Sequence, residues 1–346
     1  MTALKITSMG MYCAVGCSTS AATAAIRAGM DHFRETDFVG PQGSPLLGAQ
    51  LYGVELWGAA RMRRMFQQVL DECLSGDPLL LPQQTCLLLI TPESGRPGTD
   101  RYWQEEVYRI CTEQQAFHSS SVMLPMGKTG LVPALKLAQE LLLRSVVHKV
   151  LIIGVDSFLT PGTVTHYMDR LLCDENIEGF LPGEGAGAIC VTLSDSHCDS
   201  IVITGLGQAY EEAHYLQKKL PNRSQGLTTA IRMALSDSGI DLSDTHFHIS
   251  ANNGESYYAR ETTHAVSRCL NSRVQNYPHI LINACLGETG AAAGPLILAY
   301  LAATLGHPDS PGTRALIHLS DDGGQRVAAI IESFSAKKEQ VNTGAY

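Results

Sequence analysis

The sequence has little charge and lacks a surplus of basic residues. Only 17% of its 346 residues are charged, and the formal net charge is −9. A broad positive field attracts nucleic acids and anionic membranes, so this composition predicts neither of them as a partner. Arg61, Arg63 and Arg64 are a local exception. We expect them to lie on a solvated helix face, and docking of an acidic partner is the alternative.

Cysteine pairs at metal or redox spacing are also missing. The ten cysteines include no Cys-x-x-Cys pair, and most of them fall within apolar strand or helix patterns. We therefore expect buried, reduced thiols in a cytoplasmic protein. The cysteines are Cys13, Cys17, Cys73, Cys86, Cys111, Cys173, Cys190, Cys198, Cys269 and Cys285.

A long hydrophobic run is absent as well. The N-terminal pattern from Leu4 to Met11 is that of a strand and lacks the apolar core of a signal peptide. The longest apolar run, Gly290 to Leu305, is too short to span a bilayer comfortably, and its many alanines and glycines are typical of a buried helix. We expect no membrane segment. Because 45% of the residues are apolar, the chain can bury one large core or two fused ones.

Two similar tetrapeptides divide the chain. Gly-Lys-Thr-Gly at residues 127–130 and Gly-Glu-Thr-Gly at residues 287–290 each follow a short strand pattern, Val122–Leu124 or Ile280–Ile282. Each tetrapeptide also opens a run of apolar residues that is long enough for a helix. This repetition predicts two similar halves that each present the start of a helix. A chance likeness of two short motifs is the alternative.

Strand and helix patterns alternate along most of the chain. Apolar runs such as Val150–Val155 and Phe247–Ser250 predict buried strands, which indicates an α/β fold with mainly parallel sheets. We expect an N-terminal half at residues 1–196 and a C-terminal half at residues 197–335. Residues 336–346 are polar and are expected to form a tail.

The order of motifs resembles the β-ketoacyl synthases of the thiolase superfamily over nearly the whole chain. Gly179–Gly187, which reads Gly-Phe-Leu-Pro-Gly-Glu-Gly-Ala-Gly, is similar to the family signature Asp-Gly-Phe-x-x-Gly-Glu-Gly-Ala-Gly. Ile6–Gly10 resembles the first strand, Gly287–Gly294 the loop and helix of a catalytic histidine, and Asp322–Gly324 the late glycine turn. The resemblance implies a thiolase-like five-layer αβαβα core built from two duplicated halves, usually in a homodimer.

The same resemblance indicates that the catalytic residues are replaced. In the family a cysteine at the start of the central helix accepts the acyl chain, and Lys128 stands at its counterpart. The first of two catalytic histidines corresponds to Asn252, or to Ala251 with a shift of one residue, and the second to Glu288. Asp322 stands where a phenylalanine gates the acyl pocket. An ionised glutamate would repel a malonyl carboxylate and an enolate, so we do not expect condensation by the family mechanism.

Lys128 and Glu288 carry opposite charges at helix starts that face each other in the family geometry. We predict an ion pair between them, because a lysine at the positive end of a helix is otherwise unfavourable. A solvent-exposed Lys128 and a nucleophilic Lys128 with a lowered pKa are the alternatives. Residues 127–129 do not form a P-loop, because Val122 stands where that motif needs a glycine.

No cofactor or metal site is expected. His246 and His248 lie two residues apart and so on one face of a strand, but a third ligand is not apparent. We interpret both histidines as ordinary strand residues.

These observations predict a catalytically degenerate β-ketoacyl synthase-like protein that binds other proteins. It would form a homodimer, pair with a related ketosynthase as chain-length factors do in the same family, or act as a stand-alone adaptor. Residues 31–60 and 157–175 provide little cover for the core, and in this the chain resembles ketosynthase-like proteins that accompany type VI secretion cargo. An acyl-carrier protein or a secreted effector is then a further partner. A β-ketoacyl-ACP synthase or acyltransferase with a remodelled active site and a relocated nucleophile is the alternative.

Overall fold

The computed structural model describes residues 2–173, 176–194, 200–217 and 219–334. Within these residues ten strands form one continuous sheet, and two further strands form a separate hairpin. The predicted boundary at residues 196–197 and the predicted tail at residues 336–346 lie outside the described residues.

Strands alternate with helices in both halves, as the sequence predicts. The first half contains β1 (Leu4–Cys13), α1 (Thr19–Arg27), β2 (Arg34–Val39), β3 (Pro45–Gly48), α2 (Gly58–Gly76), η1 (Pro82–Gln84), β4 (Thr85–Thr91), α3 (Arg101–Thr112), β5 (Val122–Pro125), η2 (Gly127–Gly130), α4 (Leu131–Leu143), β6 (Lys149–Ser157), α5 (Pro161–His166) and β7 (Glu184–Leu193). The second half contains β8 (Ser200–Tyr210), α6 (Gln225–Ser238), η3 (Leu242–Asp244), β9 (Phe247–Ser250), α7 (Ser256–Cys269), β10 (His279–Leu281), α8 (Asn283–Leu286), η4 (Gly290–Ala292), α9 (Ala293–Thr304), β11 (Arg314–Ser320) and β12 (Gln325–Phe334).

Both halves arrange their strands in the same order. The sheet runs β10-β9-β11-β12-β8-β1-β7-β6-β4-β5. Counted outward from the middle, the first half runs β1, β7, β6, β4, β5 and the second half runs β8, β12, β11, β9, β10. In each half this is the first, fifth, fourth, second and third strand of the sheet in chain order. The strand directions match too. The fifth strand of each half is antiparallel to both of its neighbours, and the other pairs within each half are parallel. The core is thus built from two duplicated halves, joined where β1 pairs with β8.

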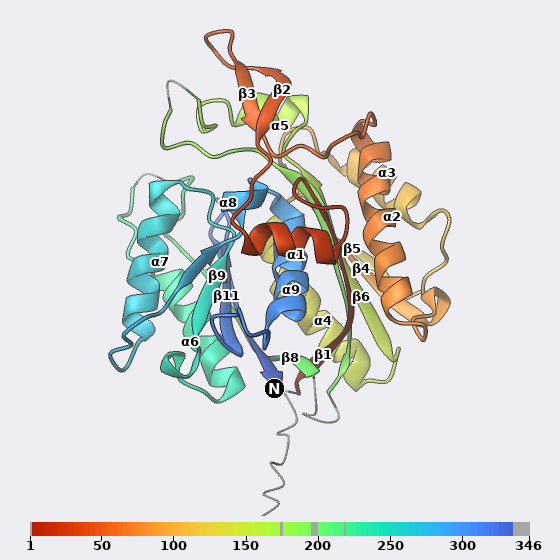
Figure 1. The fold of residues 1–346 in the computed structure, drawn as a ribbon, viewed down its shortest axis with the longest axis vertical. Helices are drawn as coiled ribbons and strands as arrows, with labels where there is room; N and C mark the ends of the chain where they lie inside the picture. The colour runs from red at the N-terminus through yellow and green to blue at the C-terminus, as the bar shows by residue number, and fades with distance from the viewer. Residues whose placement is uncertain (1, 174–175, 195–199, 218, 335–346) are drawn as a thin grey trace, which may run out of the picture.

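The helices complete five layers (Figure 1). α4 and α9 lie between the two halves of the sheet and share one apolar core with side chains from both. α2 and α3 cover the outer face of the first half, whereas α6 and α7 cover that of the second. Ten of the twelve residues of α9 are buried, which confirms the predicted buried helix. None of the described helices combines the length and the hydropathy that a bilayer span requires.

Glycines let η4 and α9 approach the first half of the sheet closely. A Cβ atom at Gly154 in β6 would overlap the carbonyl oxygen of Ala291, and one at Gly187 in β7 would overlap the backbone nitrogen of Leu296. An alanine at either position would push the helix away from the sheet. Gly187 ends the glycine-rich signature motif, so this glycine has a packing role.

The structure departs from the sequence prediction at two places. Residues 31–60 look irregular in the sequence, but they carry the β2–β3 hairpin, whose strands are short and poor in alternating apolar residues. The expectation of a solvated face at Arg61 is wrong. This arginine is only 3% exposed, and its Nε donates to Glu184 Oε2 of the signature motif at 2.7 Å. Helix α2 turns Arg61 toward the sheet together with Met62 and Met65.

Candidate functional site

Two turns bring the repeated tetrapeptides together at the starts of the central helices. The turn η2 links β5 to α4, and the turn η4 lies between α8 and α9. Gly127 has a φ of +58° and Gly287 a φ of +65°, values that residues with a side chain rarely adopt. These glycines come directly before Lys128 and Glu288, so the turns set the direction of the two charged side chains.

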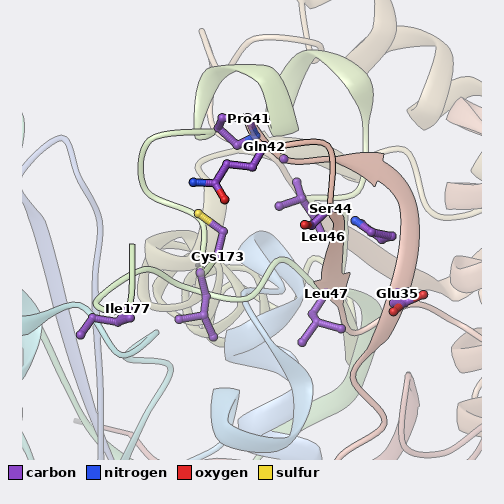
Figure 2. Close-up of a pocket in the computed structure, with 11 residues that line it drawn as sticks. Glu35, Pro41, Gln42, Ser44, Leu46, Leu47, Cys173 and Ile177 are labelled. Carbon is purple, nitrogen blue, oxygen red and sulfur yellow. The ribbon is translucent and has the colours of Figure 1, made fainter. Parts of the chain in front are cut away.

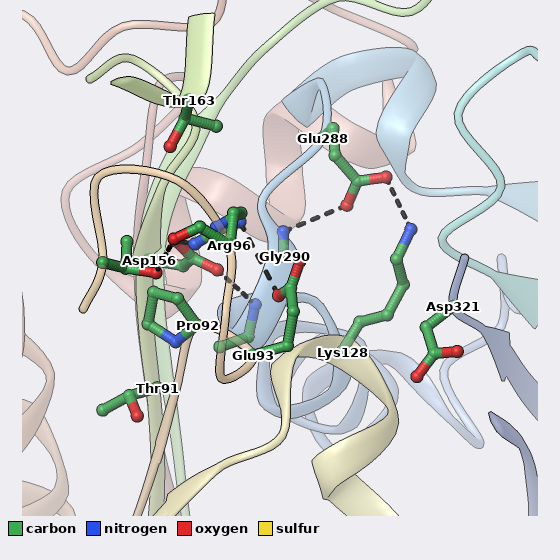
Figure 3. Close-up of polar contacts among 12 residues, drawn as sticks. Thr91, Pro92, Glu93, Arg96, Lys128, Asp156, Thr163, Glu288, Gly290 and Asp321 are labelled. Carbon is green, nitrogen blue, oxygen red and sulfur yellow. Dashed lines mark hydrogen bonds and ion pairs between the residues drawn. The ribbon is translucent and has the colours of Figure 1, made fainter. Parts of the chain in front are cut away.

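Lys128 and Glu288 form an ion pair across the two turns (Figure 3). The Nζ of Lys128 donates to Oε2 of Glu288 at 2.6 Å, and Oε1 of Glu288 accepts a hydrogen bond from the backbone N–H of Gly290 at 3.0 Å. The two side chains are 14% and 2% exposed. The predicted pair is confirmed, and the alternative of a solvent-exposed Lys128 is wrong.

The charge of Glu288 keeps Lys128 protonated. Burial by itself would lower the pKa of Lys128, but the attraction and the hydrogen bond of Glu288 outweigh burial and raise this pKa above its ordinary value. A nucleophilic lysine needs the opposite shift, because only the neutral amine attacks. The electrostatics therefore oppose the nucleophilic alternative.

A second ion cluster lies beside this pair. Arg170 donates to Asp322 Oδ2 at 2.6 Å and to both carboxylate oxygens of Glu255 at 2.8 and 2.7 Å. Tyr258 donates its hydroxyl to Asp322, and the guanidinium carbon of Arg170 lies 4.0 Å from the ring centroid of Tyr215. Burial would raise the pKa of Asp322, but the hydrogen bond and charge of Arg170 lower it below its ordinary value. An anchored carboxylate thus occupies the position where the resemblance implies an apolar gate.

Asn252 makes its side-chain hydrogen bonds to α7 and not to the ion pair. Its side-chain nitrogen donates to Thr262 Oγ1 at 2.9 Å and to the carbonyl oxygen of Tyr258 at 3.4 Å, both in α7. The next residue, Asn253, lines the same small cavity as Lys128. Three of the four predicted positions therefore meet at this cavity, and an asparagine one residue further along takes the place of the fourth.

Solved structures with this arrangement of strands and helices include ketosynthases. A chain from a type II polyketide synthase acyl-carrier protein in complex with its ketosynthase superposes with a TM-score of 0.79 at 14% identity, over 95% of this chain and 99% of that chain. The ishigamide ketosynthase/chain length factor gives a TM-score of 0.79 at 15% identity, over 96% and 100%. A β-ketoacyl synthase from Burkholderia phymatum gives 0.72 at 16% identity, over 96% and 100%. The chain has the ketosynthase fold.

The similarity lies in the fold and not in the sequence. No protein-family model matches the sequence, and no curated protein is significantly similar to it. At identities of 14–16% the ketosynthase fold is shared while the residues at its centre are free to differ. The chemistry of this chain therefore depends on its own side chains.

The cavity that Lys128 lines is small, although Glu288 and Asn253 also line a second pocket of about 210 Å³. The cavity at Lys128 has a volume of about 30 Å³. One water molecule needs about 10–15 Å³ on this scale, so the cavity holds one or two waters and no acyl chain. Carboxyl groups outnumber cations among the ionisable side chains that line it, which disfavours an anionic substrate. These side chains are Lys128, Arg170, Glu93, Glu288, Asp321 and Asp322.

Cys13 and Cys285 lie in environments that suppress their reactivity. Burial raises the pKa of Cys13 to about 12, and burial also raises the pKa of Cys285. The thiolate is the nucleophilic form, so these shifts oppose a relocated cysteine nucleophile at either position. Cys17 is an exception to the predicted burial, because it is exposed.

A larger pocket lies between the β2–β3 hairpin and the residues Leu172, Cys173 and Ile177 (Figure 2). Its volume is about 650 Å³, and Leu46, Leu47 and Cys173 are among the residues that line it. Ile177 at its margin is 85% exposed. None of the predicted site residues lines this pocket, so no chemistry is assigned to it.

The sequence did not point to Arg170, Glu255 or Tyr258. Arg170 is 85 positions from Glu255 and 152 from Asp322, and no regular spacing links such distant residues. A helical or strand period reports only which residues share a face within one element. The cluster became visible through tertiary contacts alone.

Proposed function

We propose that this chain is a catalytically degenerate protein with the ketosynthase fold that acts by binding other proteins. The observation that carries the proposal is the ion pair between Lys128 and Glu288. In the β-ketoacyl synthases that the sequence resembles, a thiol and an imidazole belong at these two positions. Here a protonated amine and a carboxylate neutralise each other, and neither is available for acyl transfer.

The surroundings of the pair also disfavour condensation. A malonyl group and an enolate are both anions, and the carboxylates of Glu288 and Asp322 would repel them. The side chain of Glu288 accepts hydrogen bonds and cannot stabilise a developing oxyanion by donating one. The loss of one preorganised donor typically lowers the rate on the order of 100-fold or more.

Strand β5 is the surface that we propose for the partner. It lies at one end of the sheet, and its four residues are apolar although each of them is at least partly exposed. An edge strand presents unpaired backbone N–H and C=O groups to other chains, and monomeric proteins usually protect it with charges. β5 is short and ends at Pro125, but it carries no charge, and its exposed apolar side chains favour a second ketosynthase-fold chain as its partner.

The partner is either a second copy of this chain or a related ketosynthase. One structurally similar protein is described as a ketosynthase/chain length factor, and another is in complex with an acyl-carrier protein. These descriptions support a ketosynthase subunit first and an acyl-carrier protein second as candidates. An accessory role for type VI secretion cargo is the adaptor version of the same proposal.

Intact-mass spectrometry after incubation with acyl-CoA or acyl-carrier protein tests the proposal. We expect no covalent acyl adduct on this chain, whereas an active ketosynthase treated in the same way gains the mass of the acyl group. Light scattering measures the mass of this chain by itself and the mass of the complex that it forms with a ketosynthase encoded beside it. An adduct that disappears when one residue is replaced would instead support the enzyme with a relocated nucleophile.

A further inference from the structure

Three histidines from neighbouring strands meet on one face of the second half of the sheet. His248, His279 and His318 lie on β9, β10 and β11, which are adjacent. His279 is opposite His248, and His318 is opposite Ser250, two residues further along β9. Since residues two apart share a face of a strand, the three side chains project on the same side. That side is covered by α6 and α7, because Leu316, opposite His248, packs in the core beneath them.

The ring nitrogens of this cluster are close together. One nitrogen from each ring can be chosen so that all three lie within 4.8 Å of one another. Nδ1 of His248 is 3.0 Å from Nε2 of His318, and the rings of His248 and His279 stack with centroids 4.0 Å apart. A tetrahedral Zn²⁺ ion with bonds of about 2.0–2.1 Å separates its nitrogen ligands by about 3.4 Å. The longest separation therefore has to close by roughly 1.4 Å, which rotation about side-chain bonds supplies.

The three rings are in the form that binds metal ions. Burial lowers the pKa of His248 to about 3 and that of His279 to about 4, and it lowers the pKa of His318 well below its ordinary value. All three are then neutral imidazoles at neutral pH, and the neutral ring is the metal ligand. His318 is fully buried, and the nitrogen that it turns toward the cluster is Nε2, 3.0 Å from Nδ1 of His248.

We propose that His248, His279 and His318 bind a divalent transition-metal ion of the Zn²⁺ class. Imidazole ligands favour Zn²⁺, Co²⁺ or Ni²⁺ over Ca²⁺ and Mg²⁺, which prefer oxygen ligands. Three protein ligands leave the fourth position to water. His279 is the least buried of the three and lies on the edge strand β10, which provides a route from solvent. The bound ion would fasten this edge strand to β9 and β11, independently of any partner at β5.

The sequence did not predict this site, because it suggested His246 as the neighbour of His248. His246 comes directly before β9, and its Nδ1 accepts hydrogen bonds from the backbone of Thr313 and Arg314 instead of joining the cluster. The other two ligands come from different strands, and His318 is 70 positions away. The expectation of a strand residue is confirmed for His248 and is wrong for His246, whereas a metal-binding role for His248 is our proposal.

Metal binding by the full-length, tag-free, chelator-treated protein tests the proposal. We expect one Zn²⁺ or Co²⁺ ion per chain in equilibrium dialysis, with the visible absorption of tetrahedral Co²⁺ and without a thiolate charge-transfer band. His279→Gln should weaken binding by more than the roughly 10–100-fold that loss of an outer-sphere partner costs. The matched control is His264→Gln, because His264 is exposed on α7, and it should keep the wild-type affinity.

Three results would overturn the site. They are the absence of stoichiometric binding at millimolar ion, equal affinities of the wild type and His279→Gln, and a thiolate band in the Co²⁺ spectrum. If His279→Gln does not fold, X-ray absorption of the wild-type Zn²⁺ complex decides. Three imidazole ligands would support the proposal, and fewer than three would refute it.

Discussion

Lys128 and Glu288 are 160 positions apart in the chain, yet their charged atoms lie 2.6 Å from each other. Their contact joins the start of α4 to the start of α9 and so links the two halves of the molecule. Because both side chains are largely shielded from water, loss of either one leaves a poorly solvated charge on the other. The pair therefore affects stability as well as chemistry.

Lys128→Ala and Glu288→Ala should each lower the free energy of unfolding by about 3 kcal/mol, since each leaves one uncompensated buried charge. The double variant should lose less than the sum of the single losses, because it removes both charges at once. Urea unfolding of the four proteins measures this coupling. Additive losses would show that the two charges do not interact.

Arg170→Met should lower the free energy of unfolding by about 3 kcal/mol, because it leaves Glu255 and Asp322 without their cation. Arg101→Met is the matched control. Arg101 is 92% exposed in a surface pair with Glu105, so its replacement should cost less than about 1 kcal/mol. Thermal and urea unfolding compare the two variants. Equal losses would contradict the role that we assign to Arg170.

The acid stability of the protein should depend on Asp322. Its pKa in the folded chain lies below the ordinary value of 3.8, so the unfolded chain takes up this proton at a higher pH than the folded chain does. Its contribution to stability is complete above pH 3.8 and is lost as the pH falls through the folded pKa. Asp322→Asn should therefore lose less stability than the wild type between pH 4 and pH 2, although it starts from a lower value at pH 7. Denaturant titrations across this range provide the measurement, and acid limbs of equal slope would refute the expectation.

A charge on β5 should separate the proposed dimer. Val122→Glu places a carboxylate on the exposed apolar edge strand, where a partner strand would have to bury it. We expect light scattering to give twice the chain mass for the wild type and the single mass for this variant. Leu281→Glu is the control, because Leu281 has similar exposure on β10, at the opposite end of the sheet. A monomeric wild type, or a Val122→Glu variant that remains dimeric, would rule out self-association through β5.

The sequence predicted the fold well because its strongest signals are local. The apolar spacing after residue 130 indicates α4, and the alanine and glycine content after residue 290 indicates the buried α9. The β2–β3 hairpin was missed, since its short strands lack a clear alternation of apolar and polar residues. Arg61 was expected in solvent, because the sequence does not show that Glu184, 123 positions away, binds its guanidinium group.

The site was predictable where the chain repeats itself and where its motifs resemble the family, which placed Lys128, Glu288 and Asp322 at one cavity. The two glycine-flanked tetrapeptides led to Lys128 and Glu288, because the same turn precedes a central helix in each half. The cluster around Arg170 and the three histidines on β9, β10 and β11 follow from strand order and loop packing. These contacts join residues that no period connects, so they required the tertiary structure.

The equal strand order of the two halves places a constraint on the history of their ion pair. A chain made of two identical halves would carry the same residue at both turns, and two lysines or two glutamates facing each other there would repel. The opposite charges of Lys128 and Glu288 must therefore have arisen after the duplication, when the halves had become different sequences. A change at either position alone would leave the charge of the other half unpaired.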